Sequence, residues 1–295
     1  MSQESEAEGD VSPVQQTLFE LPPVESIELR LPQLPHPIWT ENKARFIAKY
    51  IYLFEMITKH GTYIDGFAGP QQPERPEMWA AKLVLDIEPK WLRHFYFFEK
   101  TKAGCDLLRY LKASSAIVSD REVEVFPGDF NVELDKLLNS GRIGQKEATF
   151  CLLDQRTFEC HWTSVEKLAG YKTGGSNKIE LFYFLAAWRY RRAVTAVKHE
   201  SLLIKWWGRS DWDKLRSMKL FDVRDEFVSR FKGELSYRSA MAWPISDKNG
   251  RDMYYMIHCT DHLDAPKLMR RAYEEAVQPM KKALQYEMWK HEGDD

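Results

Sequence analysis

The sequence predicts an α/β fold with a doubly wound, Rossmann-like, mostly parallel sheet, on the strength of three observations. Short apolar runs alternate with segments of helical periodicity, which is typical of parallel strands connected by helices. Several of these runs end in an acidic residue or a glycine, at the strand ends where open α/β sheets bind ligands. Near the C-terminus two runs flank an Asn-Gly turn, which predicts a closing antiparallel hairpin.

The composition is that of a globular protein with one large domain or two small ones. The 295 residues are 44% hydrophobic and 29% charged, enough to bury a sizeable core. The formal net charge of −2 provides no overall attraction to nucleic acid, so such binding would require a local basic patch. No apolar run approaches the roughly 20 residues that span a bilayer, and the acidic, polar start is unlike a signal peptide.

The four cysteines form no Cys-x-x-Cys pair. This spacing favours reduced thiols over a disulfide framework or a zinc site. We therefore expect a cytoplasmic protein without a metal centre.

Residues 1–25 are rich in Glu, Ser, Gln and Pro and are predicted to be a disordered acidic tail. Residues 26–295 are predicted to form a single α/β domain. Its first helix is expected to begin near Thr40, a plausible N-cap, and to continue along an apolar face as far as Ile57.

Five buried strands are expected next, at residues 62–65, 94–99, 123–126, 149–153 and 179–185. Helices are predicted between them at 78–87, 103–111, 134–138 and 163–169. The last elements are a charged helical insertion at about 205–232, hairpin strands at 237–245 and 251–260, and an amphipathic helix over 267–285.

The most informative stretch is residues 63–70, Tyr-Ile-Asp-Gly-Phe-Ala-Gly-Pro, where a strand enters a glycine-containing loop. Glycines allow a backbone to approach a ligand closely, and a carboxylate accepts hydrogen bonds from amines or hydroxyls. The pattern lacks both the Gly-x-Gly-x-x-Gly of nicotinamide enzymes and the Gly-Lys-Ser/Thr of phosphate-binding loops. It resembles the first motif of class I S-adenosylmethionine (AdoMet) methyltransferases.

Acidic residues at successive strand ends extend this interpretation. The carboxyl ends of parallel strands meet in one crevice, where an acid after the second strand would suit the ribose hydroxyls of AdoMet and one after the third its adenine amine. Each acid alone could instead cap a helix or face solvent. The predicted cofactor-binding set is Asp65, Gly66, Phe67, Gly69, Glu99, Asp129 and Phe130, in which Phe130 would cover the adenine ring.

Residues 36–43 (His-Pro-Ile-Trp-Thr-Glu-Asn-Lys), 63–70 and 153–162 resemble the three-Cys-motif partner proteins (TcmP), as does the segment 253–269. The resemblance implies a methyltransferase-like fold in a bacterial or phage-associated cytoplasmic protein. It also implies a protein partner whose three-Cys motif is of the kind that binds an iron–sulfur cluster in radical-AdoMet enzymes. The process involved would be nucleic-acid modification or a mobile-element system.

The acceptor side is predicted from the segment after the fourth strand. Amino-methylating enzymes commonly carry Asn/Asp-Pro-Pro-Tyr/Phe there, and this chain reads Asp154-Gln155-Arg156-Thr157-Phe158. Asp154, Arg156 and Phe158 are the candidate catalytic residues, with Phe158 stacking on the acceptor. The missing prolines argue against methylation of a base amine. Arg156 either binds a phosphate or carboxylate, or pairs with Asp154 or Glu159, and the sequence leaves both open.

A stretch after the fifth strand interleaves cations with aromatic residues. Cations contact phosphates and rings stack on unpaired bases, so the stretch predicts a nucleic-acid or partner surface. A solvated helix with its tryptophans in the core is the alternative. The residues concerned are Arg189, Arg191, Arg192, Lys205, Trp206, Trp207 and Arg209.

Two hypotheses of function follow. The first is an AdoMet-dependent methyltransferase acting on nucleic acid or on a nucleic-acid-bound product. The second is a non-catalytic scaffold that keeps the fold and binds the three-Cys protein. Phosphodiester cleavage by the acidic cluster with a metal is a weaker third, because the strand-end acids suit a ribose at least as well.

Overall fold

The computed structural model describes residues 39–276 except 116–119, 174, 176, 187–189, 198–199 and 247–251. The predicted acidic tail, the Asn-Gly turn and the end of the predicted last helix lie outside these residues.

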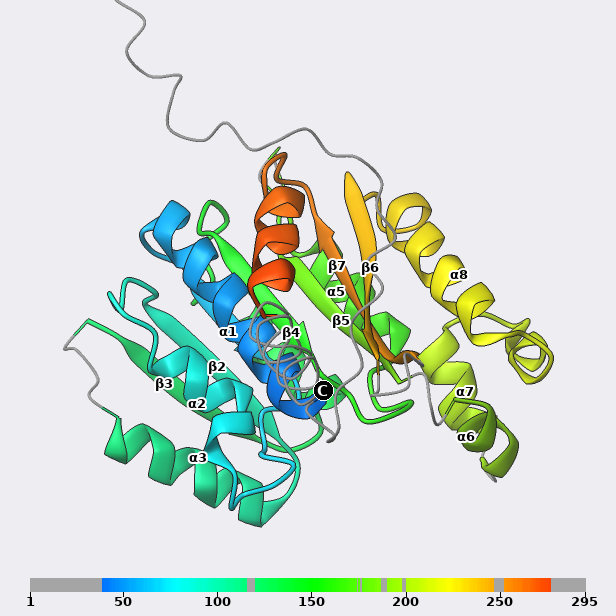
Figure 1. Cartoon of the computed structure of the whole chain (residues 1–295), viewed down its shortest axis with the longest axis horizontal. Helices are drawn as coiled ribbons and strands as arrows, with labels where there is room; N and C mark the ends of the chain where they lie inside the picture. Colours follow the sequence, from blue (N-terminus) through cyan, green and yellow to red (C-terminus); the bar gives the residue numbers. More distant parts are fainter. Residues whose placement is uncertain are drawn as a thin grey trace, which may run out of the picture. The chain divides into compact units, whose positions relative to one another are not determined.

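The described strands form one seven-stranded sheet in the order β3-β2-β1-β4-β5-β7-β6 (Figure 1). Strands β1 to β5 pair in parallel, and β7 runs antiparallel to both β5 and β6. The predicted mostly parallel sheet with an antiparallel C-terminal pair is confirmed. The strands are β1 (Thr62–Asp65), β2 (His94–Glu99), β3 (Glu122–Pro127), β4 (Thr149–Leu153), β5 (Glu180–Ala186), β6 (Ser239–Ser246) and β7 (Asp252–Thr260).

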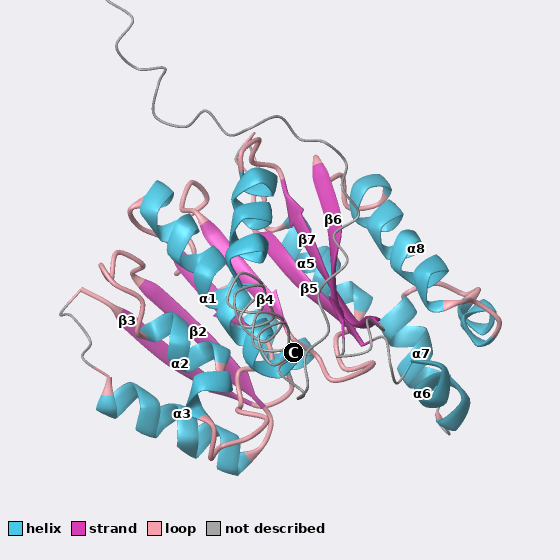
Figure 2. Cartoon of the chain, in the orientation of Figure 1, coloured by secondary structure: helices cyan, strands magenta, loops and turns pink. Residues whose placement is uncertain are grey.

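Helices cover both faces of this sheet, as Figure 2 shows. One face carries α1 (Trp39–Thr58), whose Phe46 meets Phe182 of β5. The other carries α4 (Phe130–Leu138), α5 (Trp162–Gly170) and α8 (Leu220–Gly233). The remaining helical elements are η1 (Pro76–Met78), α2 (Ala80–Leu85), α3 (Lys102–Ser114), α6 (Tyr190–Ala196), α7 (Glu200–Trp207), η2 (Trp212–Arg216) and a helix over residues 265–276.

The core has two layers because strand side chains alternate between the faces of the sheet. Tyr63 stacks on Phe150 at 6.1 Å beneath α1, whereas Ile64 and Cys151 face the cluster that contains α4, α5 and α8. Every residue of β4 is buried. This explains the near-continuous apolar runs of the sequence, since a strand covered on both faces loses the polar alternation of a half-exposed one.

Several boundaries differ from the sequence expectation. The helix predicted over 78–87 is divided into η1 and α2, and the one predicted from Leu134 begins at Phe130, where the Asp129 side chain caps it. Between β5 and β6 the described residues include α6, α7, η2 and α8, so the helical region there begins before residue 205.

The cysteines and the helices provide two further findings. Cys105, Cys151, Cys160 and Cys259 are all free and buried. Within the described ranges, no helix combines the length and apolar character needed to cross a membrane.

Candidate functional site

A cleft of about 230 Å³ opens at the carboxyl ends of β1 to β4. Strand β1 lies between β2 and β4 in the sheet, so this edge is the point where the strand order reverses and where doubly wound sheets bind ligands. All seven predicted cofactor residues line the cleft, together with Asp154 and Arg156. The structure thus brings together residues that span about 90 positions of the sequence, although their roles stay predictions.

Glu99, the last residue of β2, is held in the cleft by three donors. The backbone N–H of Gly69 donates to Oε2 at 3.1 Å, while the N–H and hydroxyl of Thr101 donate to Oε1 at 2.7 and 2.6 Å. Gly104 is equally close, since a Cβ there would lie 2.6 Å from Glu99 Cγ. An ionised carboxylate has about four acceptor positions, so Glu99 retains capacity for a ligand hydroxyl.

Asp65 ends β1 at the floor of the cleft and is only 2% exposed. Its carboxylate accepts hydrogen bonds from the Phe67 N–H at 3.1 Å and the Tyr63 hydroxyl at 3.3 Å. Burial raises the pKa of Asp65 to about 7, and the negative charge of Asp154 acts in the same direction. Near neutral pH this carboxyl group is therefore partly protonated, whereas an exposed aspartate is almost fully ionised there.

Lys43 of α1 is the functional candidate that sequence reasoning missed. Its Nζ lies 2.8 Å from each oxygen of Asp154 and 4.4 Å from the centroid of the Phe184 ring. The side chain of Lys43 is 4% exposed and that of Asp154 is 12% exposed. A signal existed, because Lys43 lies three and four residues before Phe46 and Ile47 and so continues the apolar face of α1.

Asp129 caps a helix, one of the alternatives that the sequence left open, and its role toward a cofactor stays a prediction. Its Oδ1 accepts hydrogen bonds from the backbone N–H and side-chain amide of Asn131, both at 2.8 Å, and so caps α4, while the residue also lines the cleft. Phe130 is packed against Phe67 and Phe98 at 5.6 and 5.1 Å between ring centroids. Its ring therefore forms part of the cleft wall.

The loop after β4 is fixed by Gln155, which occupies a position where related motifs have proline. Its Nε2 donates to the carbonyl of Phe184 at 3.2 Å, and its Oε1 accepts from the N–H of Cys160 at 2.9 Å. The side chain is fully buried. Two hydrogen bonds to backbone groups, one within the loop and one on β5, thus order a segment that lacks the rigidity of proline.

The predicted stacking role of Phe158 is wrong. Its ring is buried against Trp206, with 4.8 Å between centroids, and it is absent from the cleft lining. An apolar ring is stabilised by about 1.5 to 3 kcal/mol when it is fully buried, which favours the core over the cleft mouth.

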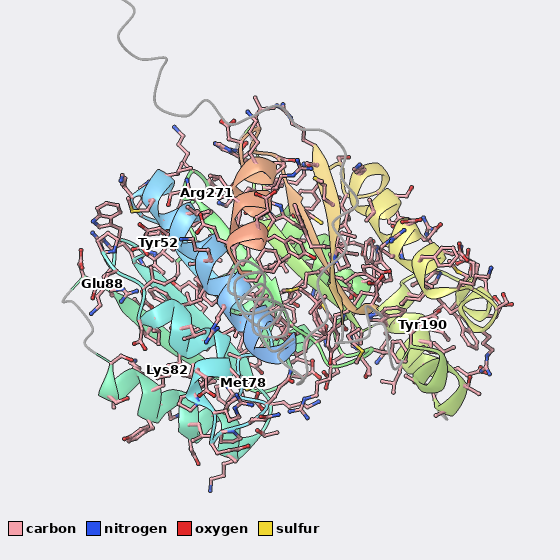
Figure 3. The ribbon with its side chains drawn as sticks, in the orientation of Figure 1. Tyr52, Met78, Lys82, Glu88, Tyr190 and Arg271 are labelled. Carbon is pink, nitrogen blue, oxygen red and sulfur yellow. The ribbon has the colours of Figure 1, made fainter. Side chains whose placement is uncertain are left out.

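The predicted basic and aromatic surface is also wrong in part. Trp206 and Trp207 are fully buried and contact Phe227 of α8, so they cannot stack on bases. Arg209 forms ion pairs with Glu226 and Glu234. Tyr190, labelled in Figure 3, is buried at the start of α6, and its hydroxyl donates a hydrogen bond to the carbonyl oxygen of Leu215.

Of the remaining residues in that prediction, Lys205 is exposed. Arg189 and the side chains of Arg191 and Arg192 lie outside the described residues. Among the residues that the structure describes, no group of three or more His, Cys, Asp or Glu side chains is arranged to hold a metal ion.

The order and directions of the strands define a class I methyltransferase-like fold, with the last strand inserted antiparallel between β5 and β6. No protein-family model and no curated protein sequence matches the chain.

The solved structures that match this chain include several methyltransferases. The small RNA methyltransferase HEN1 matches with 13% identity and a TM-score of 0.45 over 81% of this chain, but only 27% of HEN1 is covered. A putative O-methyltransferase from Klebsiella pneumoniae matches with 12% identity and a TM-score of 0.42 over 78% of this chain and 92% of its own. The O-methyltransferase from Bacillus cereus, in complex with S-adenosylhomocysteine, matches with 14% identity and a TM-score of 0.38 over 77% and 92%.

Proposed function

We propose that this chain is an AdoMet-dependent methyltransferase. The observation that carries the proposal is the cleft at the strand-order reversal, where Glu99 is fixed by the glycine loop after β1. The charge of the cleft agrees with this ligand. Five acidic and three basic side chains line it, a formal net charge of −2. AdoMet is a cation, because its sulfonium and ammonium charges outnumber its single carboxylate, so the net charges of cofactor and cleft are of opposite sign.

Each part of the cofactor has a complementary group in the cleft. Glu99 would accept a hydrogen bond from a ribose hydroxyl, and Asp129 from the adenine amine, beside the Phe130 ring. The loop Gly66 to Gly69 would approach the methionine end, near the Asp65 carboxyl group. AdoMet supplies an electrophilic methyl group when bound.

The chain itself then has to position the acceptor nucleophile in line with that methyl group, because methyl transfer of this kind depends mainly on orientation. Asp154 and Arg156 lie on the side of the cleft formed by the end of β4 and are the residues for this task. Glu159 accepts a hydrogen bond from the backbone N–H of Arg156 at 2.8 Å and so helps to fix the conformation of this loop.

A protein with a three-Cys motif is the proposed partner, and nucleic acid is the proposed origin of the acceptor. Both rest on the resemblance of residues 36–43, 63–70 and 153–162 to the TcmP family. Co-purification of the chain with such a protein would test the first proposal. Transfer of a radiolabelled methyl group to RNA or DNA would test the second.

A non-catalytic scaffold is the second candidate function. It is favoured by the ion pair between Asp154 and Lys43, which engages the acid that would otherwise orient an acceptor amine. A comparison of methyl transfer by the wild type and by Asp154→Asn separates the two candidates. A methyltransferase loses activity in this variant, whereas a scaffold has none to lose and still binds its partner.

The deciding experiment is calorimetric titration with AdoMet and with S-adenosylhomocysteine. We expect micromolar dissociation constants for the wild type. Glu99→Ala should bind about 10- to 100-fold more weakly, because hydrogen bonds to a charged group contribute about 1.5 to 3 kcal/mol. Glu74→Ala, which removes an exposed acid outside the cleft, is the matched control and should bind normally. A folded wild type that binds neither compound, alone or with its partner, would refute the proposal.

A further inference from the structure

Arg156 is an unpaired cation at the mouth of an acidic cleft. Its side chain is exposed and lines the cleft. Among the described residues, no hydrogen bond or ion pair engages its guanidinium group. Two carboxylates stand two and three residues away in sequence, at Asp154 and Glu159, so the absence of a pair requires a cause.

Asp154 already has a cationic partner, because the Lys43 ammonium lies against both of its oxygens. The Lys43 ammonium is 2.8 Å from Oδ1 and 2.8 Å from Oδ2, and the aromatic ring of Phe184 lies 4.4 Å from it. Both side chains are largely removed from water. Opening such a pair would leave a buried ammonium without a partner, which is strongly unfavourable.

Glu159 also has a cationic partner. Its Oε1 accepts a hydrogen bond from Lys100 Nζ at 2.9 Å. Its Oε2 accepts a hydrogen bond from the backbone N–H of Arg156 itself at 2.8 Å. The second bond is made to the main chain and leaves the guanidinium free. Both carboxylates that the sequence offered as partners are therefore engaged elsewhere.

We propose that Arg156 binds an oxyanion of the methyl acceptor, a phosphate or a carboxylate group, and that Lys43 preserves this site by engaging Asp154. A guanidinium group presents a planar set of donors that matches an oxyanion in two-point contact. The other two basic side chains of the cleft, Lys43 and Lys100, are paired with Asp154 and Glu159. Among the described residues of the lining, Arg156 is therefore the cation that remains for an acceptor anion. The inference deepens the proposed function and rests on it for the statement that the bound anion belongs to a methyl acceptor. The anion site itself can be tested without the cofactor.

The test uses the Nε–H resonance of Arg156 in ¹⁵N-labelled full-length protein, assigned from its disappearance in Arg156→Lys. The protein is titrated with inorganic phosphate and, separately, with acetate at the same ionic strength. The Nε–H resonance of Arg109, whose guanidinium pairs with Asp106 on the surface of α3, is the internal reference. We expect a saturable shift of the Arg156 resonance at millimolar anion, with little change at Arg109. Stronger binding of phosphate identifies a phosphate-bearing acceptor, and stronger binding of acetate a carboxylate-bearing one.

Variants of the ion pair test the role of Lys43. In Lys43→Met the carboxylate of Asp154 loses its partner and should pair with Arg156, so anion affinity should fall at least tenfold. In the double variant Lys43→Met/Asp154→Asn the competing charge is gone, and affinity should return to within about twofold of the wild type. If Lys43→Met alone does not fold, the double variant still tests the proposal, because weak anion binding by the double variant would contradict it.

The proposal is overturned if neither anion shifts the Arg156 resonance in the wild type, or if folded Lys43→Met binds anions as the wild type does. Calorimetric titration of the same samples with S-adenosylhomocysteine keeps this result separate from the proposed function. Anion binding without cofactor binding, alone or with the partner, would refute the methyltransferase proposal and leave the anion site in place. The reverse result would refute only the anion site.

Discussion

The backbone N–H of Gly69 donates a hydrogen bond to Glu99 Oε2 over 3.1 Å, and a Cβ at position 69 would lie 2.2 Å from that oxygen. The two residues come from the loop after β1 and the end of β2, strands that are paired in parallel. The glycine thus has a steric reason to be there, because real Cβ atoms do not approach an oxygen so closely. The loop and the carboxylate form one unit of the cleft.

Gly69→Ala should weaken cofactor binding while leaving the fold intact. The new methyl group displaces the flexible end of Glu99 and breaks the hydrogen bond at Oε2. We expect AdoMet affinity to fall about tenfold, in line with the loss of a charge-assisted hydrogen bond of about 1.5 kcal/mol, with a change in unfolding free energy below about 1 kcal/mol. Calorimetry and urea unfolding measure the two quantities. A variant that binds normally would show that Glu99 does not need this position.

The raised pKa of Asp65 predicts a contribution to stability that declines with pH. Because burial raises this pKa from 3.8 to about 7, the folded protein binds the proton more tightly than the unfolded chain. The contribution is fully present below about pH 4 and is lost as pH rises to about 7, with a limiting slope of about 1.4 kcal/mol per pH unit.

Asp65→Asn removes this titration, so its unfolding free energy should rise relative to that of the wild type between pH 5 and 7. Urea unfolding of both proteins at several pH values measures the difference. Asp106→Asn, at an exposed position on α3, should follow the wild type in parallel. A constant difference between Asp65→Asn and the wild type across this range would contradict the assignment.

Trp206→Ala should destabilise the fold by about 3 to 5 kcal/mol, the usual cost of removing a large buried ring. Trp206 is fully buried and contacts Phe158 and Phe227 at 4.8 and 4.9 Å between centroids. Lys205→Ala changes the exposed neighbour on the same helix and should shift the unfolding free energy by less than about 0.5 kcal/mol. Urea unfolding of the two variants measures both effects. If the two variants changed the unfolding free energy by equal, small amounts, the burial of Trp206 would be contradicted.

Gly208→Ala should destabilise the fold for two reasons. Gly208 has a φ of +73°, and a Cβ there would lie 2.5 Å from the Cβ of Trp162. We expect a loss of about 1 to 3 kcal/mol from strain, measured by thermal or urea unfolding. Gly233→Ala is the matched control, since no atom lies within 4 Å of the position that its new methyl group would take and the residue ends helix α8. That variant should be neutral or slightly more stable, and a stable Gly208→Ala would disprove the steric argument.

Much of the fold was predictable because its determinants are local. A strand buried on both faces needs a short continuous apolar run, and residues 94–98 and 149–153 meet that requirement without reference to the rest of the chain. The cofactor side of the cleft was predictable for a related reason. Once parallel strands are assigned, their carboxyl ends must share one edge, so Asp65, Glu99 and Asp129 had to lie near one another.

The acceptor side was harder to predict because it depends on side-chain direction. Phe158 and Trp206 carry the residue types of a stacking surface, but a ring is equally suited to a core. A short helix such as α7 has apolar residues on much of its circumference, so its sequence alone does not indicate which face packs against other elements. The packing of α8 decided that Trp206 and Trp207 are buried.

The sequence by itself determined the order of strands and helices, the glycine loop after β1 and the acidic residues at the strand ends, because each follows from periodicity and local backbone chemistry. Only the tertiary structure decided how the charges pair. Lys43 and Asp154 are 111 residues apart, and nothing local links them. Their pairing depends on α1 crossing the sheet beside β4 and β5. This packing leaves the Arg156 guanidinium without a partner among the described residues.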